Sequence, residues 1–589
     1  MYRGHHHLLS CTRRWNPTVS SYMGHRASSL KQPVLSLQRQ ISSTSTTAKR
    51  SATTSKFYKR IGLTAATAAT GTALYYTNED FRHVITAFER CGVAGKTGVM
   101  VALDYKATLS KDYGDDEVRR LQARSECHLR CAKRVLDSLQ RLGGIYVKLG
   151  QHVSAMVYLL PVEWTSTMAV LQDRCDPTPP EDIRQLFLTD YGHPIEAIFD
   201  EFDWTPIGVA SLAQVHKARL ASTGQWVAVK LQHPNLDEFC KIDMQTVSAI
   251  FDCIYYFFPD FGFGWLVEEM KESLPQEMNF VHEASNAHQV SVNFATNQTT
   301  ALVIPKTVWV LRRIMCMEFI EGARIDDLDY MKQHNIDPRA VSTELTRVFS
   351  EMIFLHGFVH CDPHPGNVII RPSTGKKHGQ NFDLVLLDHG LYRTLTTQLR
   401  NDYAHLWTSL IQGDEEGIRT YSYRVGGTEG YQLFASMLTG REWAKIHEAD
   451  LNSTRGQEEL GRMAKGALDF LVEVADILGK MPRTVLLLLK TNDLLRHVDE
   501  QLNVVPDERI TYVIMGQYCS RAVWLETRAH LVHKLHELGW QWQLLKHLAG
   551  AWWDYHRLEY ALWFYQLCSV WLDDAHAVWL KCTRWYHHH

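Results

Sequence analysis

Residues 357–368 read Gly-Phe-Val-His-Cys-Asp-Pro-His-Pro-Gly-Asn-Val, and this segment is the most informative part of the chain. It places Asp362 and Asn367 five residues apart in a loop bounded by proline and glycine. Pro363 and Pro365 fix their own backbone angles and remove two N–H donors, so a regular helix is excluded here. An acid and an amide are therefore held on rigid backbone, which a site with defined geometry requires.

The gap between Asp362 and Asn367 equals that of the kinase catalytic loop. There the Asp accepts the proton of the substrate hydroxyl and the Asn holds a metal ion. After a predicted strand over 383–387, Asp388 and Gly390 occupy the place of the Asp-Phe-Gly motif, whose Asp binds Mg²⁺. Catalysis of phosphoryl transfer depends more on neutralising the charge of the phosphate oxygens than on covalent bonds to the enzyme. These few polar groups therefore predict a phosphate-binding site.

Three upstream segments follow the order that a kinase would have. Lys230 ends an apolar strand (VAVK), and Glu283 lies in a predicted helix over 280–290, from which it can pair with Lys230. Met317–Gly322 (MEFIEG) ends a strand at the position of a kinase hinge, with Glu318 in that hinge. Alone, Lys230 would be read as a side chain that extends to the surface. The shared order of all these motifs makes chance agreement the weaker interpretation.

Hydrophobic periodicity predicts an α+β fold with a small sheet lobe and a larger helical lobe. The predicted segments are a helical stretch at about 120–172, a β-hairpin at 207–232, strands at 302–310 and 314–319, and helices from about 395 onward, with 485–489 as a buried helix segment.

Composition sets the remaining limits. A chain of 589 residues is long enough for two domains plus tails. The net charge of −3 gives no basic field for a nucleic-acid partner, and a mean hydropathy of −0.23 excludes a polytopic membrane protein. Twelve scattered cysteines without a Cys-x-x-Cys pair argue against a zinc site or a disulfide framework.

The N-terminus differs in kind from the rest. Residues 1–60 contain eleven Lys and Arg and no Asp or Glu, which is typical of a mitochondrial transit peptide, although a disordered basic tail has the same composition. Residues 61–76 carry no charge and are flanked by charged residues. This run is slightly short for a span, so a membrane anchor and a buried or surface-lying helix both remain open.

In combination, the motifs resemble those of the UbiB/aarF family of atypical kinases, in the branch of the aarF-domain-containing kinases. The resemblance runs from about residue 60 to 500. The matching stretches are Tyr146–His152 (YVKLGQH), Leu171–Gln172, Ala210–His216 (ASLAQVH), 227–234 (VAVKLQHP), 277–287 (EMNFVHEASNA), 317–322, 357–368, 386–392 (LLDHGLY), 401–411 (NDYAHLWTSLI) and 486–496 (LLLLKTNDLLR).

The resemblance implies ATP as nucleotide and Mg²⁺ as metal, with Mn²⁺ as an alternative. Lys230 would bind the α- and β-phosphates, Glu283 would orient Lys230, and Asp362 would act as base. Asn367 and Asp388 would hold the metal. The nucleotide would also meet an alanine-rich loop, made of Gly208, Val209, Ala210, Ser211, Leu212, Ala213, Gln214 and Val215. Because this loop lacks the glycines of an ordinary protein kinase, it restricts the backbone angles, and that class fits poorly.

Lys148, Gly150 and Gln151 match the family's KxGQ motif, carried by a helical extension. Lys148 and Gln151 share one helix face and would be read structurally as a surface pair. The resemblance instead lays this helix across the active site as a gate against protein substrates, in contact with Glu277 of the family's ExD motif. Asn279 stands where the family usually has Asp, which removes a charge near Lys148 and would weaken the latch.

Three features leave alternatives open. Eight of the 17 Trp residues lie between 540 and 585, as amphipathic helices at a lipid interface or as a helical cap on the core. His360 and His364 flank Asp362. They are either a pair of metal ligands or groups that orient the loop by hydrogen bonds. His389 replaces the Phe of Asp-Phe-Gly, as a titratable or a packed side chain.

The expected protein is a mitochondrial, inner-membrane-associated atypical kinase or ATPase. The resemblance suggests a lipid-like or small-molecule substrate and a role in mitochondrial lipid homeostasis and cristae organisation, with protein partners unknown. A pseudokinase scaffold switched by nucleotide is the alternative. The predicted regions are a leader (1–60), a membrane anchor (61–78), the KxGQ extension (79–200), an N-lobe (201–322), a C-lobe (323–500) and a Trp-rich helical region (501–589).

Overall fold

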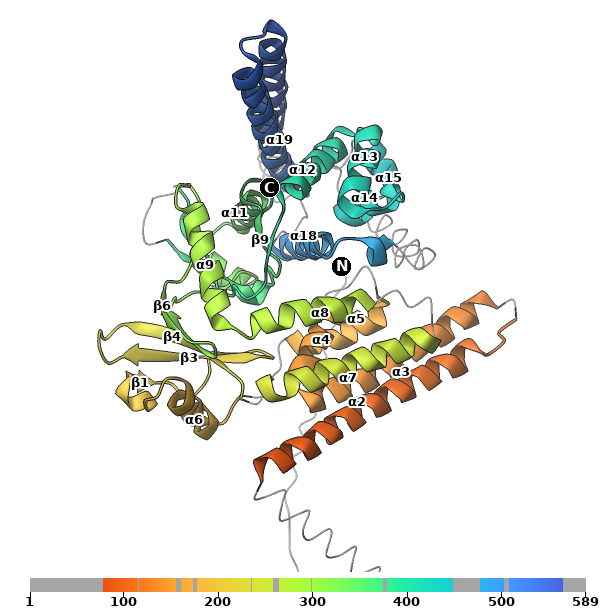
Figure 1. Cartoon of the computed structure of the whole chain (residues 1–589), viewed down its shortest axis with the longest axis vertical. Helices are drawn as coiled ribbons and strands as arrows, with labels where there is room; N and C mark the ends of the chain where they lie inside the picture. Colours follow the sequence, from red (N-terminus) through yellow and green to blue (C-terminus); the bar gives the residue numbers. More distant parts are fainter. Residues whose placement is uncertain are drawn as a thin grey trace, which may run out of the picture. The chain divides into compact units, whose positions relative to one another are not determined.

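The computed structural model describes residues 78–564 except for 115, 155–159, 173–176, 235, 258–263, 298, 374–378, 449–476 and 503–507 (Figure 1). The predicted leader (1–60) and uncharged segment (61–76) therefore lie outside the described residues. None of the helices that the structure does describe combines the length and the apolar character needed to cross a bilayer.

The small lobe is an antiparallel sheet with the strand order β1-β3-β4-β7-β6, in which β2 pairs with β3. Side chains along β3 alternate between buried and half-buried positions, as expected for a strand with one covered face. The tight turn at 221–225 joins β3 to β4, so the predicted hairpin is confirmed. The strands are β1 (Phe199–Phe202), β2 (Gly208–Val209), β3 (Ala213–Leu220), β4 (Trp226–Gln232), β6 (Thr307–Val310) and β7 (Ile314–Glu318).

The predicted single strand over 302–310 was wrong. Pro305 has no N–H to donate to a strand ladder, and the segment breaks there into β5 (Leu302–Val303) and β6. The two halves then join different sheets, since β5 pairs in parallel with β11 of the large lobe.

The large lobe carries the polar loops on two small sheets. One has the order β5-β11-β10-β8, and the other pairs β9 with β12. Their strands are β8 (Ala323–Arg324), β9 (Phe358–His360), β10 (Val368–Pro372), β11 (Phe382–Leu386) and β12 (Tyr392–Thr394). The loop after β9 leads to β10, which pairs with β11, and the loop after β11 leads to β12, which pairs with β9. These two pairings bring residues 361–367 and 387–391 together.

Helices build the rest of the large lobe. They are α10 (Leu328–Gln333), α11 (Pro338–Ser350), η3 (Glu351–His356), η4 (Pro365–Asn367), α12 (Thr397–Gln412), α13 (Glu415–Gly426), α14 (Tyr431–Thr439), α15 (Trp443–His447), α18 (Arg483–Leu502) and α19 (Glu508–Leu538), with a further helix over 542–564. Helix η4 is a single 3₁₀ turn beginning at Pro365, in agreement with the prediction that this loop holds no regular helix.

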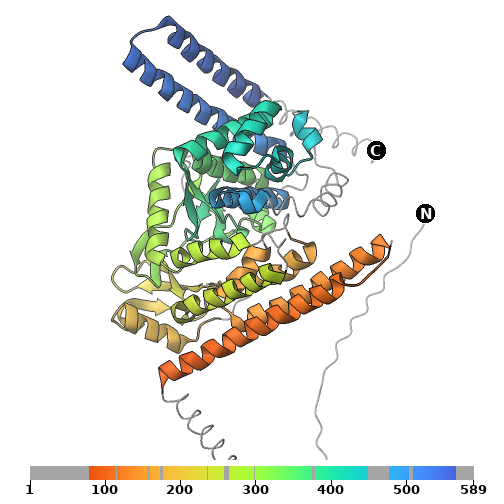
Figure 2. The same cartoon turned by 45° about the vertical axis from the view of Figure 1, so that its right-hand side comes forward.

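A helical layer precedes and interrupts the small lobe (Figure 2). It consists of α2 (Glu79–Leu109), α3 (Glu117–Leu142), α4 (Ile145–Ser154), α5 (Val162–Met168), η1 (Ala169–Gln172), α6 (Pro180–Asp190), η2 (Ile195–Ala197), α7 (Leu236–Phe257) and α8 (Gly264–Glu277), followed by α9 (Phe280–Phe294). Arg90 of α2 binds both carboxylate oxygens of Asp243 on α7, so α2 is tied to the inserted helices as well as to α3.

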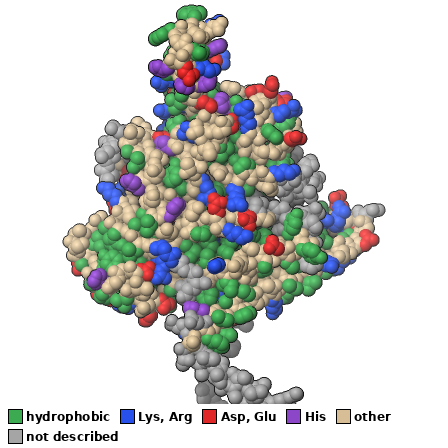
Figure 3. All heavy atoms as spheres, in the orientation of Figure 1, with side chains coloured by type: hydrophobic (Ala, Val, Ile, Leu, Met, Phe, Trp, Pro, Cys, Tyr) green, Lys and Arg blue, Asp and Glu red, His purple; other side chains and the backbone are tan. Residues whose placement is uncertain are grey.

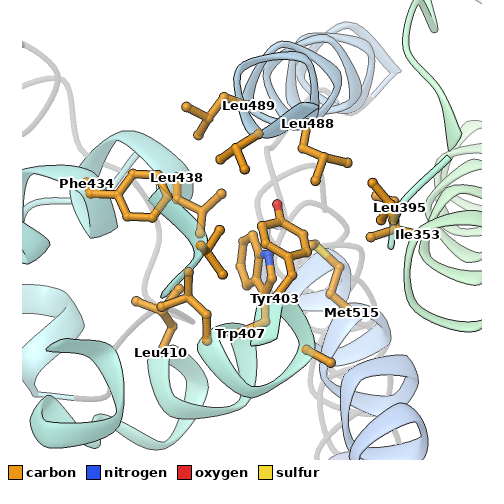
Figure 4. Close-up of a cluster of buried hydrophobic side chains, with 14 of the residues drawn as sticks. Ile353, Leu395, Tyr403, Trp407, Leu410, Phe434, Leu438, Leu488, Leu489 and Met515 are labelled. Atoms are coloured by element: carbon orange, nitrogen blue, oxygen red, sulfur yellow. The ribbon is translucent and has the colours of Figure 1, made fainter. Parts of the chain in front are cut away.

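The core of the large lobe lies around α12 (Figure 4). Tyr403 and Trp407 of α12 are buried against Leu488 and Leu489 of α18 and Met515 of α19. All five residues of the apolar run Val485–Leu489 are buried, as predicted from the sequence. This packing fixes the position of α18 and therefore of the polar residues that follow the run.

Replacing Leu488 tests this core. We expect Leu488→Ala to lower the free energy of unfolding by about 2–5 kcal/mol, because a buried leucine loses its transfer energy and leaves a cavity. Chemical denaturation followed by circular dichroism measures the loss. Val118→Ala, at an exposed apolar position on α3, is the matched control and should change stability by less than about 0.5 kcal/mol. Equal effects of the two substitutions would contradict this description of the core.

Candidate active site

Three separate segments meet at Lys230. This residue lies on the central strand β4, opposite Val215 of β3 and Met315 of β7. Its Nζ donates to Glu283 Oε1 at 2.6 Å and to Oε2 at 2.9 Å, and it lies 3.5 Å from Asp388 Oδ2. One ammonium group thereby joins the sheet, helix α9 and the Asp-His-Gly loop.

The charges of this cluster are largely withdrawn from water. Glu283 is only 2% exposed; burial raises its pKa to about 7, with Asp388 adding to that rise and Lys230 opposing it. Burial alone would lower the pKa of Lys230, but Asp388 and Glu283 outweigh it and raise the pKa above its ordinary value. Lys230 is therefore a cation throughout the physiological pH range and presents a fixed positive charge to the cavity.

His360 links the two acidic motifs through their backbones. Its Nε2–H donates to the carbonyl of Asp388 at 2.6 Å, and its Nδ1 accepts from the N–H of Asp362 at 3.0 Å. Burial lowers the pKa of His360, so the neutral ring keeps this donor and this acceptor. His364 Nδ1 likewise accepts from the N–H of Gly366. Both rings orient the loop, which is the second of the two alternatives that the sequence left open.

Asn367 and Asp388 provide oxygen ligands of the kind that Mg²⁺ prefers. The amide nitrogen of Asn367 donates to the carbonyl of Asp362 at 3.1 Å, which turns its Oδ1 away from that bond. Asp388 Oδ1 accepts from the N–H of Gly390, and its Oδ2 faces Lys230. A Cβ on residue 390 would lie 3.1 Å from Asp388 Oδ1, so glycine keeps this carboxylate uncrowded.

A third oxygen in the same cavity is available as a ligand. Glu277 Oε1 is buried in the cavity wall and has no hydrogen-bond partner. No group of three or more His, Cys, Asp or Glu residues is arranged to hold a metal alone within the described segments. The donor set instead suits Mg²⁺, which commonly takes one or two carboxylates and completes its shell with phosphate oxygens and water.

Lys490 is a site residue that the sequence motifs did not predict. This residue follows the buried apolar run on α18, and its Nζ donates to Asp362 Oδ1 at 2.8 Å. Burial would raise the pKa of Asp362, but Lys490 and Lys148 outweigh it and hold the pKa well below its usual range. While this ion pair is intact, Asp362 is a weak base. The sequence does contain a signal for this contact. Lys490 is a single cation directly after an apolar helical run, and a largely buried charge needs a partner of opposite sign.

Helix α4 crosses the cavity with the KxGQ residues. Lys148 Nζ forms an ion pair with Glu277 Oε2 at 2.8 Å. Gln151 Nε2 donates to the carbonyl of Leu171 at 3.0 Å, and its Oε1 accepts from the hydroxyl of Ser211 at 3.3 Å. The helix is thus attached both to the acid at the end of α8 and to the loop between β2 and β3.

Gly150 allows this close packing. A Cβ at this position would collide with Cδ1 of Leu171, a buried residue of η1. The glycine of the motif therefore serves the approach of the helix rather than any contact with a ligand.

The walls described so far enclose one cavity of about 170 Å³. It is lined by Lys148, Gln151, His152, Ala210, Ser211, Leu212, Ala213, Lys230, Glu277, Phe280, Glu283, His360, Asp362, His364, Asn367, Asp388, Gly390, Leu391, Lys490 and Leu494. Sites that bind a whole small molecule usually measure about 300–1,000 Å³. While α4 is held by Lys148 and Gln151, the cavity is therefore small for a nucleotide.

Some predicted site residues lie elsewhere. Asn279 does not line the cavity, because its side chain caps α9 by accepting from the N–H of Val281. Glu318 ends β7 and accepts from the N–H of Lys306, outside the cavity lining. Only the middle of the predicted nucleotide loop, Ala210–Ala213, faces the cavity. The remaining members belong to the paired strands β2 and β3, namely Gly208, Val209, Gln214 and Val215. The side chain of Gln214 also binds Thr178 and His216.

His389 is a packed side chain. Its Nε2–H donates to the carbonyl of Leu386 and its Nδ1 accepts from the hydroxyl of Tyr392 at 2.9 Å. Burial lowers its pKa to about 3. The ring is therefore neutral at physiological pH, which decides against the titratable alternative.

Comparisons with known proteins show the family of this chain. Residues 170–422 match the family described as the ABC1 atypical kinase-like domain. The chain is 42% identical to an ABC1 family protein MCP2 homolog of Schizosaccharomyces pombe, over 74% of this chain and 80% of the relative. It is 40% identical to AarF domain-containing protein kinase 1 of Mus musculus, over 78% and 86%. The solved Rv3197–erythromycin complex of Mycobacterium tuberculosis aligns with a TM-score of 0.40 and 19% identity, over 65% of this chain and 97% of that one.

The ion pair of Lys490 gives a pH-dependent prediction. Because the pKa of Asp362 lies well below its unfolded value of about 3.9, the pair stabilises the fold fully above that pH and loses this effect progressively as the pH falls from there towards the folded-state pKa. We expect Lys490→Met to reduce the free energy of unfolding by about 1–3 kcal/mol at neutral pH and by less at about pH 3. Denaturant titrations at both pH values measure the difference.

Lys490→Arg is the matched control, since it keeps a cation beside Asp362. A loss of stability in Lys490→Met that is equally large at both pH values would show that the stem of the lysine, and not its charge, supports the fold.

Proposed function

Because this chain belongs to the ABC1 family of atypical kinase-like proteins, we propose that it binds Mg-ATP and transfers or hydrolyses the terminal phosphate. The observation that carries this proposal is the contact of one buried ammonium, Lys230, with Glu283 at 2.6 Å and with Asp388 at 3.5 Å. Phosphoryl transfer is catalysed mainly by positioning and by charge, and this cluster supplies both.

Each residue then has a distinct task. Lys230, oriented by Glu283, binds phosphate oxygens, and Asn367 and Asp388 hold the metal. When bound, Mg²⁺ neutralises charge that develops on the phosphate oxygens. Asp362 receives and orients the attacking hydroxyl or water once a ligand draws Lys490 away, because only then does the basicity of its carboxylate return.

The proposed substrate is a lipid-like or other small molecule. The cavity is about 170 Å³, and α4 covers it through the contacts of Lys148 with Glu277 and of Gln151 with Ser211. An extended polypeptide would need these contacts to open along its length, whereas a small acceptor needs only a local opening. The contacts of α4 therefore favour a small acceptor over the protein substrates of an ordinary kinase.

The proposed location is the mitochondrial inner membrane. Its support is the leader of residues 1–60, which has eleven Lys and Arg and no acid, followed by the uncharged run of residues 61–76. A role in mitochondrial lipid homeostasis and cristae organisation is proposed on the sequence resemblance alone.

A nucleotide-switched scaffold is the second candidate. One observation favours it: Asp362 is held by Lys490 in a state of low basicity, so nucleotide could bind without turnover. Such a protein would report nucleotide occupancy through the opening of α4.

ATP turnover separates the two candidates. With the full chain, ATP and Mg²⁺, we expect Asp362→Asn to reduce phosphate release by about 10²–10⁴-fold while nucleotide binding persists, because only the acceptor of the proton is removed. Asp326→Asn, which alters an acid of the same lobe outside the cavity lining, is the matched control. Equal slow release by the wild type and Asp362→Asn, with nucleotide bound by both, would establish the scaffold.

The latch has its own test. Lys148→Met removes the ion pair with Glu277, and we expect nucleotide to bind about three- to tenfold more tightly because less free energy is needed to move α4. Titration with a fluorescent ATP analogue measures the change. Lys148→Arg, which keeps the charge, should resemble the wild type. Weaker binding by Lys148→Met would mean that Lys148 holds the phosphates directly.

A further inference from the structure

A helical hairpin projects from the large lobe (Figures 1 and 2). Helix α19 forms one arm and residues 542–564 form the other. The arms pack through their inner faces, where the rings of Trp524 and Tyr555 stack at 6.0 Å and Leu531 and Leu562 are buried. The hairpin is therefore a defined element with a base, two arms and a tip.

The tip exposes large apolar side chains. Leu538 is 59% exposed, Trp540 89% and Trp542 79%, around the turn at Gly539, whose φ of 76° favours glycine. By contrast, Trp407 in the core of the same lobe is almost completely buried. Soluble proteins rarely expose such a group of apolar side chains without a partner.

The aromatic surface continues along the second arm. Its exposed members are Trp552, Trp553, Tyr560, Trp563 and Phe564. A cap packed on the kinase core would bury these rings. Of the two alternatives that the sequence left open for the described part of the Trp-rich region, the structure is thus inconsistent with the packed cap.

Charge around the tip is mainly positive. Between Arg528 and Gly550 the chain has three Lys or Arg residues and four His residues but a single acid, Glu537. In Figure 3 the end of the projecting hairpin is hydrophobic, and His, basic and acidic side chains lie below it. An apolar, Trp-rich tip within a basic collar is complementary to an anionic lipid surface, where Trp occupies the interface and Lys and Arg meet the headgroups.

We propose that the segment Leu538–Trp542 inserts into the interface of an anionic bilayer and docks the large lobe there. Trp540 and Trp542 enter the boundary between headgroups and acyl chains, while Lys534 and Lys546 remain among the anionic headgroups. The second arm lies at the surface and does not cross, because Lys546, Asp554 and Arg557 interrupt it.

Charge also disfavours a second copy of this chain as the occupant. Two tips with the same basic collar repel each other, whereas an anionic surface attracts each of them. An acidic protein would share the electrostatic match, and the experiment below distinguishes it from lipid.

Docking at this tip would orient the active site. Helix α19 packs against α11 and α12, and its Tyr512 and Met515 belong to the same buried cluster as Leu488 of α18, two residues from Lys490. A lipid-like acceptor would thus be drawn from the surface on which the enzyme rests. This consequence depends on the proposed function, but the docking itself does not.

Quenching of tryptophan fluorescence by brominated acyl chains tests the inference. The full chain is mixed with vesicles of brominated phosphatidylcholine, either alone or with phosphatidylglycerol. We expect strong quenching on the anionic vesicles, weaker quenching on phosphatidylcholine alone and a decline with added salt. In Trp540→Ser/Trp542→Ser the quenching should fall to less than half, even if another segment keeps the chain on the vesicle.

Matched variants isolate the cause. Tyr423→Ser removes an exposed aromatic side chain of the same lobe away from the hairpin and should leave quenching unchanged. Lys534→Glu/Lys546→Glu should lower quenching on anionic vesicles only. The helicity of each variant shows that the fold persists. Because neither helicity nor quenching requires ATP, failure of the proposed function would not affect this test.

Three results would overturn the proposal. The first is equal quenching of the wild type and the double Trp variant. The second is quenching that ignores both phosphatidylglycerol and salt. The third is a fall in oligomer size of the double Trp variant in solution without any change in quenching, which would assign the tip to contacts between protein chains.

Discussion

The structure depends on keeping one ammonium group, that of Lys230, largely out of water. A buried charge is costly unless it is paired, and the partners of Lys230 come from segments 53 and 158 residues further along the chain. The sheet, α9 and the loop after β11 must all be in place before the charge is neutralised. This requirement couples the folding of the small lobe to that of the polar loops of the large lobe.

The same principle recurs on the other walls of the cavity. Lys148 comes from α4 and pairs with Glu277, and Lys490 comes from α18 and pairs with Asp362. Lys230 and Lys490 now contact carboxylates where, in the proposed reaction, they would contact phosphate oxygens. Exchanging one anion for another keeps each ammonium paired, so a nucleotide can replace the internal ion pairs without leaving a bare charge.

Local sequence patterns predicted much of the site, and the predictions that were wrong have local causes. Lys230, Glu283, Asp362, Asn367 and Asp388 line one cavity because their spacing follows a fold with a known order of elements. Two other predictions assumed that a residue at a motif position also contacts the ligand. Asn279 and Glu318 occupy motif positions, yet neither side chain lines the cavity. Asn279 caps α9, and Glu318 at the end of β7 accepts from the N–H of Lys306. A pattern specifies where the backbone goes, but competing backbone groups decide what a polar side chain binds.

By itself the amino-acid order determined the class of fold, the sequence of its motifs and the rigid loop around Asp362, because periodicity, proline and spacing act over a few residues. Only the tertiary structure placed Lys490 on Asp362, 128 residues away, and left Trp540 exposed at a tip while Trp407 was buried. Contacts of this kind depend on the packing of whole helices, and no local pattern records which face of a helix will meet a partner.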